Sequence, residues 1–409
     1  MSDIVHSITL FLNIILITIM LAILGVWIYL ISYLTKSYLY SPRLKDSNMC
    51  RFDKFPKVSV ILPARNEEKY IAECMRSIAN QDYPNFEIIA INDSSADETG
   101  QNILRYSKTN NKVIAVDAGP KPEGWVGKSW ACYQGFKKST GDLLLFTDAD
   151  TQHSASLMSL SVYLMLEQNL DALTVIPKLL CVDMWTKVTL PMLSIFLHTR
   201  FSPLRVNNPR NKTGYFFGSF FVICRDAYEK IGTHEGVKQE LIEDGALGRK
   251  VKESGFKLKM FRGEELVTAI WARDLNSLWH GLRRLMIPLY SQHRTKTALM
   301  IIAIFFMLFQ PFILLPYSFT IPFIFDDNQT ISYLLISANI LTVSLIILGY
   351  AVQSRLSAYQ NAIFAFASPV AAAIISFSFI SSAYDAKKID AVKWRDRHYT
   401  ITQRQHPLN

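Results

Sequence analysis

An Asp-Ala-Asp triplet directly after an apolar run is the strongest chemical signal in this sequence. Asp148 and Asp150 follow Leu143–Phe146, a run that predicts a short buried strand. Two carboxylates one residue apart beyond a strand can converge on a hard divalent cation, Mg²⁺ or Mn²⁺, that also binds phosphate oxygens. Taken alone, the triplet is more often a structural turn or helix cap, because Asp favours both. Its interpretation therefore depends on the elements around it.

A second apolar run ends in another candidate carboxylate. Asp93 follows Glu87–Ile91, which predicts a strand, and Ser95–Glu98 then matches a capping box that opens a helix. Because a serine can cap that helix, the Asp93 carboxylate remains available to accept hydrogen bonds from a base or ribose. The alternative is that Asp93 is itself a structural cap.

The first apolar run, Val58–Leu62, also ends in polar residues. Its end offers backbone amides and a charged pair at the same edge of the predicted sheet, although by itself it is only a capped helix start. The residues concerned are Pro63, Arg65 and Glu67.

A segment rich in Gly and Pro, Gly119–Lys128, interrupts the regular pattern and ends in a cation. A mobile loop with Lys128 beside a phosphate site would clamp a diphosphate, whereas a solvated surface loop is an equally good interpretation. Gly127-Lys128-Ser129 does not match the phosphate-binding P-loop, because Gly124 lies too close to it.

An acidic pair, Glu243 and Asp244, opens a segment whose apolar residues Leu247 and Val251 have helical spacing. Transfer of a group to a hydroxyl needs a carboxylate that takes the hydroxyl proton, and either acid could do this. The alternative is that the pair only complements the helix dipole.

The elements that must position these residues form an alternating series. Short apolar runs at 58–62, 87–91, 113–116 and 143–146 alternate with helical patterns such as Ile71, Cys74, Met75 and Ile78. This alternation predicts an α/β fold with a largely parallel sheet covered by helices on both faces. Ligands of such sheets bind beyond the carboxyl ends of the strands, where the polar clusters fall.

Composition and charge point to a membrane. Half of the residues are hydrophobic, and they concentrate at the two ends of the chain. The net charge of +9 comes without a nucleic-acid-binding motif, so we expect no nucleic-acid partner. Basic residues that flank apolar segments are typical of a cytoplasmic membrane surface. Five scattered cysteines without a Cys-x-x-Cys spacing indicate buried thiols rather than disulfides or a zinc site.

The uncharged stretch Leu10–Leu34 exceeds the about 20 residues that cross a bilayer and predicts a retained N-terminal anchor. Three further apolar stretches, Ala298–Phe325, Ile331–Val352 and Ala362–Ala383, predict C-terminal spans. Positive residues after the anchor place the middle of the chain in the cytoplasm. A cytoplasmic basic tail then requires that Ala362–Ala383 is re-entrant or that Ala298–Phe325 folds back on itself.

Two segments read as amphipathic helices at the membrane interface. The first spans 271–297 and combines apolar spacing with Trp271, Arg283 and Arg284, and the second is Asp183–Arg205, which Pro191 complicates.

Together and in this order, the motifs resemble the family-2 glycosyltransferases of the GT-A fold, over roughly Val58 to Arg284. The Gly-Trp-Val-Gly-Lys-Ser-Trp-Ala stretch from Gly124 and the trailing Asp148–Thr151 are similar to carotenoid-acid and hopanoid-associated members, which carry one N-terminal and several C-terminal spans.

The resemblance implies a role for each motif. Pro63, Arg65, Glu67 and Asp93 would bind the nucleoside of a nucleotide sugar, a UDP-sugar by preference, and Lys128 would bind its diphosphate. Asp148 and Asp150 would hold ribose and metal, and Glu243-Asp244 would supply the catalytic base, usually the Asp. Trp125, Arg283 and Arg284 would bind the acceptor or phosphate.

One departure from the family's motifs narrows the range of reactions that we expect. Processive polysaccharide synthases carry Gln-x-x-Arg-Trp, where this sequence has His280–Arg284 without the Gln and the Trp. This difference favours inverting transfer of a single sugar to a membrane lipid of isoprenoid type. The alternatives are a polyprenyl-phosphate sugar synthase, a polysaccharide synthase and, from another class, a nucleotidyltransferase.

The predicted organisation follows from these assignments. We expect a multi-pass protein of the cell membrane with its catalytic domain in the cytoplasm. The predicted parts are an anchor at 1–35, a basic linker at 36–57, a GT-A catalytic domain at 58–270, an interfacial segment at 271–297, a transmembrane region at 298–384 and a basic tail at 385–409.

Overall fold

The computed structural model describes residues 2–45, 55–324, 329–357, 359–386, 392–394 and 397–399. The chain forms two compact units, each assembled from three stretches of sequence. The helical unit comprises Met1–Leu39, Cys181–Thr199 and Ala272–Lys388, and the α/β unit comprises Tyr40–Leu180, Arg200–Trp271 and Ile389–Asn409.

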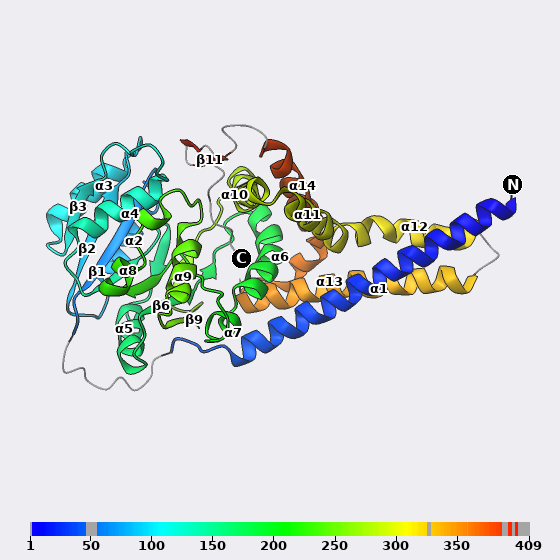
Figure 1. Cartoon of the computed structure of the whole chain (residues 1–409), viewed down its shortest axis with the longest axis horizontal. Coiled ribbons are helices and arrows are strands. Elements are labelled where there is room, and N and C mark those ends of the chain that lie inside the picture. Colours follow the sequence, from blue (N-terminus) through cyan, green and yellow to red (C-terminus); the bar gives the residue numbers. More distant parts are fainter. Residues whose placement is uncertain are drawn as a thin grey trace. The chain divides into compact units, whose positions relative to one another are not determined.

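A seven-stranded sheet in the order β3-β2-β1-β4-β8-β6-β9 is the centre of the α/β unit (Figure 1). The first four strands in this order are parallel to one another, β8 runs antiparallel to β4 and β6, and β9 is parallel to β6. The mixed α/β fold that was predicted is therefore confirmed. The strands are β1 (Val58–Ala64), β2 (Phe86–Asn92), β3 (Val113–Asp117), β4 (Leu143–Phe146), β6 (Ala172–Ile176), β8 (Phe221–Cys224) and β9 (Leu258–Arg262).

Helices cover both faces of this sheet because its strands present apolar side chains to either side. In β1, Val58, Val60 and Leu62 belong to one buried cluster and Ile61 belongs to the other. Each such side chain, once buried, contributes about 1.5–3 kcal/mol. The first face is covered by α2 (Ile71–Ala79), α3 (Thr99–Thr109) and α5 (Leu157–Glu167), and the second by α4 (Gly127–Lys138), α8 (Arg225–Lys230) and α9 (Glu243–Glu253).

Helix α4 packs unusually close to the sheet. A side chain at Gly135 would lie 2.7 Å from Ile91 and 2.8 Å from Ile61, so this position needs a glycine. The close packing fixes the helix that carries Lys128.

The predicted helix face of α2 is confirmed, whereas the predicted capping box is wrong. Helix α3 begins at Thr99, and the Ser95 hydroxyl accepts a hydrogen bond from the Asn66 N–H (3.1 Å) instead of capping it. The Asn66 side chain in turn accepts from the Ala96 N–H (2.9 Å). Contacts between two loops thus replace the local cap.

Smaller elements complete the α/β unit. A three-stranded sheet joins β5, β10 and β7, and a hairpin joins β11 and β12. Their bounds are β5 (Thr151–His153), β7 (Lys178–Leu179), β10 (Val267–Ala269), β11 (Val392–Trp394), β12 (Arg397–Tyr399), α7 (Pro203–Val206) and η1 (Glu235–Val237).

The helical unit is held together by contacts between helices that are far apart in sequence. The Trp27 indole N–H donates to the Met307 carbonyl (3.3 Å), and the Tyr350 hydroxyl donates to the Val188 carbonyl (2.7 Å). The helices are α1 (Ser2–Tyr40), α6 (Met184–Arg200), α10 (Leu275–Gln292), α11 (Arg294–Leu308), α12 (Gln310–Ile324), α13 (Gln329–Ser357), η3 (Ala362–Ala367) and α14 (Ser368–Asp385).

Three helical segments are long and apolar enough to cross a membrane, namely Ser7–Tyr40, Gln329–Ser357 and Ala362–Asp385. A fourth candidate, α11 with α12, is bent by 47° at a short break. Pro311 explains the break, because proline lacks the N–H that would continue the helix. Three of the apolar stretches predicted from the sequence fall within these segments. The fourth, Ala298–Phe325, covers the bent pair, and Phe325 lies outside the described residues.

The two predicted amphipathic segments are helical. The buried residues Leu278 and Leu282 on α10 have the predicted spacing, and Asp274 caps this helix by accepting from the Ser277 N–H (2.7 Å). Helix α6 continues through Pro191. The described cysteines Cys74, Cys132, Cys181 and Cys224 are free thiols, whereas Cys50 and most of the basic tail lie outside the described residues.

Candidate active site

The Asp-Ala-Asp triplet forms the turn between β4 and β5. Hydroxyl groups fix its backbone: Thr151 donates to the Asp148 carbonyl (2.7 Å), and Thr147 donates to the Ser219 carbonyl (2.8 Å). Asp148 and Asp150 are both partly exposed. The turn therefore holds two carboxylates at the carboxyl end of β4, as predicted.

Lys128 connects this turn with the acidic pair of α9. Its ammonium group lies 2.7 Å from an Asp148 carboxylate oxygen and 2.7 Å from a Glu243 carboxylate oxygen. Lys128 stands in the first turn of α4 and not at the end of a loop, which corrects the sequence interpretation. The structure thus brings three of the predicted residues together from three separate elements.

Gly218, just before β8, leaves the space in which these groups meet. A Cβ atom at this position would lie 2.7 Å from Asp244 Oδ2, 3.0 Å from Lys128 Nζ and 3.1 Å from Asp148 Oδ2. Asp244 also accepts a hydrogen bond from the Gly245 N–H (2.7 Å), which fixes its carboxylate at the start of α9. We refer to Lys128, Asp148, Glu243 and Asp244 as the carboxylate cluster.

The charges of the carboxylate cluster alter its titration. Burial and the neighbouring Glu243 raise the pKa of Asp244 to about 7. Burial opposes protonation of Lys128, but Asp148, Glu243 and Asp244 outweigh it and raise the Lys128 pKa well above its usual value. Lys128 therefore stays charged, whereas Asp244 can take up a proton near neutral pH.

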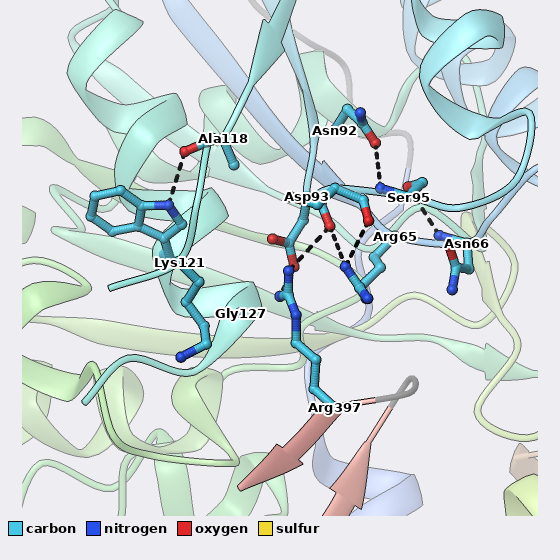
Figure 2. A network of polar contacts seen from close by, with 12 residues as sticks. Arg65, Asn66, Asn92, Asp93, Ser95, Ala118, Lys121, Gly127 and Arg397 are labelled. Atoms are coloured by element: carbon cyan, nitrogen blue, oxygen red, sulfur yellow. Dashed lines mark hydrogen bonds and ion pairs between the residues drawn. The ribbon is translucent and has the colours of Figure 1, made fainter. Parts of the chain in front are cut away.

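The predicted nucleoside residues lie at the ends of β1 and β2. The Arg65 guanidinium donates to the carbonyls of Asp93 (2.7 Å) and Ser94 (2.8 Å), and so holds the loop that carries the Asp93 carboxylate (Figure 2). Pro63 lies within β1, and the buried Glu67 donates its N–H to the Thr99 hydroxyl (2.7 Å).

The predicted acceptor residues are distributed over both units. Trp125 packs edge-on against Trp130 (5.2 Å between ring centroids), next to the start of α4. Arg283 and Arg284 lie on α10 in the helical unit, where Arg283 forms an ion pair with Asp385 (2.7 Å).

The acids of this region are chemically suited to a divalent cation, with Lys128 as a positive neighbour. Their donor atoms are carboxylate oxygens, which Mg²⁺ and Mn²⁺ prefer, and Gly218 supplies the space that a side chain would fill. Within the described ranges, no three His, Cys, Asp or Glu side chains form a ready-made metal cage. Mg²⁺ commonly binds one or two carboxylates together with substrate phosphates, so such a cage is not required.

Three residues of this region escaped the sequence analysis. Gly218 can be recognised as a site residue only in the structure, where side chains from α4, α9 and the turn after β4 surround it. Arg397 and Tyr399, on the C-terminal strand β12, reach Asp93 and Gly127 across most of the sequence. No local pattern distinguishes these two residues from others in the tail.

Comparison with known proteins finds one matching family model and several similar proteins. Residues 59–232 match the model of Glycosyl transferase family 2. The probable glycosyltransferase YdaM of Bacillus subtilis (strain 168) is 28% identical over 273 residues, which are 64% of this chain and 63% of YdaM. The 4,4'-diaponeurosporenoate glycosyltransferase of Staphylococcus aureus (strain USA300) is 26% identical over 242 residues, 55% of this chain and 59% of that enzyme. The chain thus spans less than two thirds of the length of these curated relatives.

A solved structure shares the fold over most of the chain. The mannosyltransferase PcManGT from Pyrobaculum calidifontis, in complex with GDP-Man and Mn2+, has a TM-score of 0.51 and is 16% identical. The similarity covers 91% of this chain and 99% of PcManGT. At this level of identity the similarity establishes a common fold.

Proposed function

We propose that the chain is a family 2 glycosyltransferase of GT-A fold and that it transfers a single sugar from a nucleotide sugar to a membrane lipid. The observation that supports this proposal most is the carboxylate cluster around Gly218. It places one cation and three acids at the edge of the sheet where ligands of such folds bind.

The donor is a nucleoside diphosphate sugar, with a UDP-sugar preferred. We assign its nucleoside to the loop of Asp93, which Arg65 supports, and to the ends of β1 at Pro63 and Glu67. Lys128 binds the diphosphate, because its side chain remains partly exposed while it bridges Asp148 and Glu243. PcManGT was solved with a nucleotide sugar, which agrees with this class of donor.

Asp148 and Asp150 would hold a divalent cation, Mg²⁺ or Mn²⁺. When bound, the cation would neutralise negative charge on the diphosphate leaving group. PcManGT was solved with Mn2+, which agrees with this choice of metal.

Asp244 acts as the general base in an inverting transfer. Its carboxylate takes the proton of the acceptor hydroxyl while the acceptor oxygen forms a bond to the anomeric carbon. The bond between that carbon and the diphosphate breaks, and the nucleoside diphosphate leaves with the electron pair. The raised pKa of Asp244, about 7, matches this role, because a base is most effective near the working pH.

The apolar helices of the helical unit support a lipid acceptor. Three segments are long enough to span a membrane, and the proposed location is the cell membrane with the catalytic unit in the cytoplasm. We assign Arg283 and Arg284 on α10, together with Trp125, to the acceptor or its phosphate. An isoprenoid-like lipid fits the similarity to the diaponeurosporenoate enzyme.

Lipid mass spectrometry tests the proposal. Membranes of cells that express the full chain should contain a lipid heavier by one sugar, which is absent when Asp244→Asn is expressed at the same level. Arg105→Ala, which removes an exposed charge from α3, is the control and should leave the lipid unchanged. Absence of any such lipid from cells that express the wild type would contradict the proposal. A product that persists in Asp244→Asn would instead indicate a phosphate acceptor, which needs no base.

A further inference from the structure

The C-terminal strand β12 places an arginine on the carboxylate that we assign to the nucleoside. Arg397 Nη1 lies 2.6 Å from Asp93 Oδ2, and Nη2 lies 3.4 Å from the Asp93 carbonyl (Figure 2). The two residues are 304 positions apart in the sequence. Their side chains are 17% and 5% exposed, so the contact is largely shielded from water.

The same strand also contacts the start of α4. The Gly127 N–H donates a hydrogen bond to the Tyr399 hydroxyl oxygen (3.3 Å), and Tyr399 is buried. A side chain at Gly127 would collide with the Arg397 guanidinium, so the glycine makes room for it. Arg397 and Tyr399 therefore contact the residue that follows β2 and the first residue of α4.

Both hydrogen bonds resemble those that a bound nucleotide would form with the same two residues. A guanidinium is planar and presents N–H donors to a carboxylate, as the edge of a nucleobase does. A hydroxyl oxygen on the first amide of a helix takes the place of a ribose or phosphate oxygen, which such amides bind. In addition, Asp93 Oδ1 is buried and has no hydrogen-bond partner among the described residues. One acceptor thus remains unsatisfied while β12 is in place, and a nucleobase cannot reach it.

We propose that the C-terminal hairpin β11–β12 is an internal competitor of the donor: Arg397 and Tyr399 occupy the nucleoside end of the site, and the hairpin must leave before a nucleotide binds. This inference rests on the proposed function, because it takes Asp93 as a nucleoside ligand. When the hairpin docks, the apparent affinity for the donor equals the affinity of the open site multiplied by the fraction of molecules in which the site is open.

The charge of a neighbouring lysine opposes the docked state. Lys121 lies in the same region, and burial together with the charge of Arg397 lowers the Lys121 pKa. Two cations therefore face one carboxylate, and their repulsion reduces the stability of the docked hairpin. A diphosphate would instead be attracted by Lys121.

Binding of nucleotides to the purified full chain tests this proposal. The apparent Kd of UDP and of GDP, each with Mn²⁺, is measured by calorimetry for the wild type, Arg397→Ala, Arg397→Lys and Tyr399→Phe. Hydrogen bonds to charged groups correspond to about 10- to 150-fold in an equilibrium constant, and the partial exposure of Arg397 favours the lower limit. Arg397→Ala should therefore bind about tenfold more tightly. Tyr399→Phe should bind more tightly by a smaller factor, and the control Lys108→Ala, which removes an exposed charge from α3, should bind like the wild type.

Hydrogen exchange gives a second readout that does not depend on the variants. The amides of residues 392–399 should exchange faster in the wild type when the nucleotide is saturating, because the hairpin leaves. Unchanged or weaker binding by Arg397→Ala, or slower exchange of the hairpin with nucleotide, would overturn the inference and make Arg397 a part of the donor site. If no variant binds either nucleotide, the proposed function itself fails, an outcome that differs from equal binding by all variants.

Discussion

Replacement of Gly218 by alanine tests whether the carboxylate cluster is the reacting centre. The backbone of Gly218 does not adopt the left-handed conformation that favours glycine, so alanine is conformationally acceptable. The new methyl group, however, would lie 2.7 Å from Asp244 Oδ2, whereas real Cβ atoms essentially never approach another heavy atom within 3.0 Å. The Asp244 carboxylate must therefore move, while the fold is retained.

The size of the effect follows from this geometry. Moving Asp244 Oδ2 from 2.7 Å to between 3.0 and 3.4 Å displaces the proposed base by about 0.3–0.7 Å. A misplacement of 1 Å can cost about 100-fold in rate, so a proportional effect on the barrier predicts a kcat about 4- to 25-fold lower. Lys128 and Asp148 need to move less, since their atoms lie at 3.0 and 3.1 Å, so the KM for the donor should change less than kcat.

The assay measures initial rates of transfer from a radiolabelled nucleotide sugar to a lipid extract, with the purified full chain. Gly25→Ala is the matched control, because among the described residues the added Cβ on α1 meets nothing within 4 Å beyond its chain neighbours and the nearby backbone of its own helix. A Gly218→Ala variant with wild-type kcat and an unchanged unfolding temperature would refute the assignment of the reacting centre to this cluster.

Three further predictions concern single residues. Asp150→Asn should lower kcat/KM about a hundredfold or more at saturating Mn²⁺, because a metal contributes several kcal/mol to stabilisation of the leaving group; a twofold effect would contradict this role. Asp244 must be deprotonated to act as a base, and its pKa is about 7, so log kcat/KM should rise with unit slope up to about pH 7 and then level off. A flat profile between pH 5 and 8 would argue against that base. Burial opposes ionisation of Glu87, but hydrogen bonds from Lys57, Ser59 and Thr140 outweigh it and lower the Glu87 pKa from 4.5 to about 2. The ionised Glu87 therefore stabilises the fold fully above pH 4.5, and this stabilisation is lost as the pH falls toward 2. Denaturant unfolding should show Glu87→Gln to be less stable by about 1–2 kcal/mol at pH 7 and equal to the wild type near pH 2.

The central sheet could be predicted because its strands are short, continuous apolar runs. Leu143–Phe146 and Glu87–Ile91 are buried on both faces, so their sequences carry a strong signal. Polar residues beyond the carboxyl ends of such strands must lie at one edge of the sheet, which is why Asp148 and Asp93 could be selected as candidates. The helix that begins at Glu243 was likewise predicted from its apolar spacing.

Features that depend on contacts between distant segments could not be predicted. The predicted capping box at Ser95 is wrong because the Ser95 hydroxyl instead accepts a hydrogen bond from the Asn66 N–H of another loop. The position of Lys128 in a helix depends on the packing of Gly135 against β1 and β2. The contact of Arg397 with Asp93 joins residues 304 positions apart, and nothing in the local sequence marks it.

The most direct test of the central claim measures both products of one reaction. The purified full chain is incubated with a radiolabelled nucleotide sugar, Mn²⁺ and a membrane lipid extract, and both the nucleoside diphosphate and the labelled lipid are quantified. Sugar transfer predicts that they form in equal amounts, that both fall at least about a hundredfold in Asp244→Asn, and that no pyrophosphate appears. Nucleoside diphosphate formed without any labelled lipid would contradict the assignment. So would the absence of both products if the same protein releases pyrophosphate in a parallel reaction supplied with a nucleoside triphosphate.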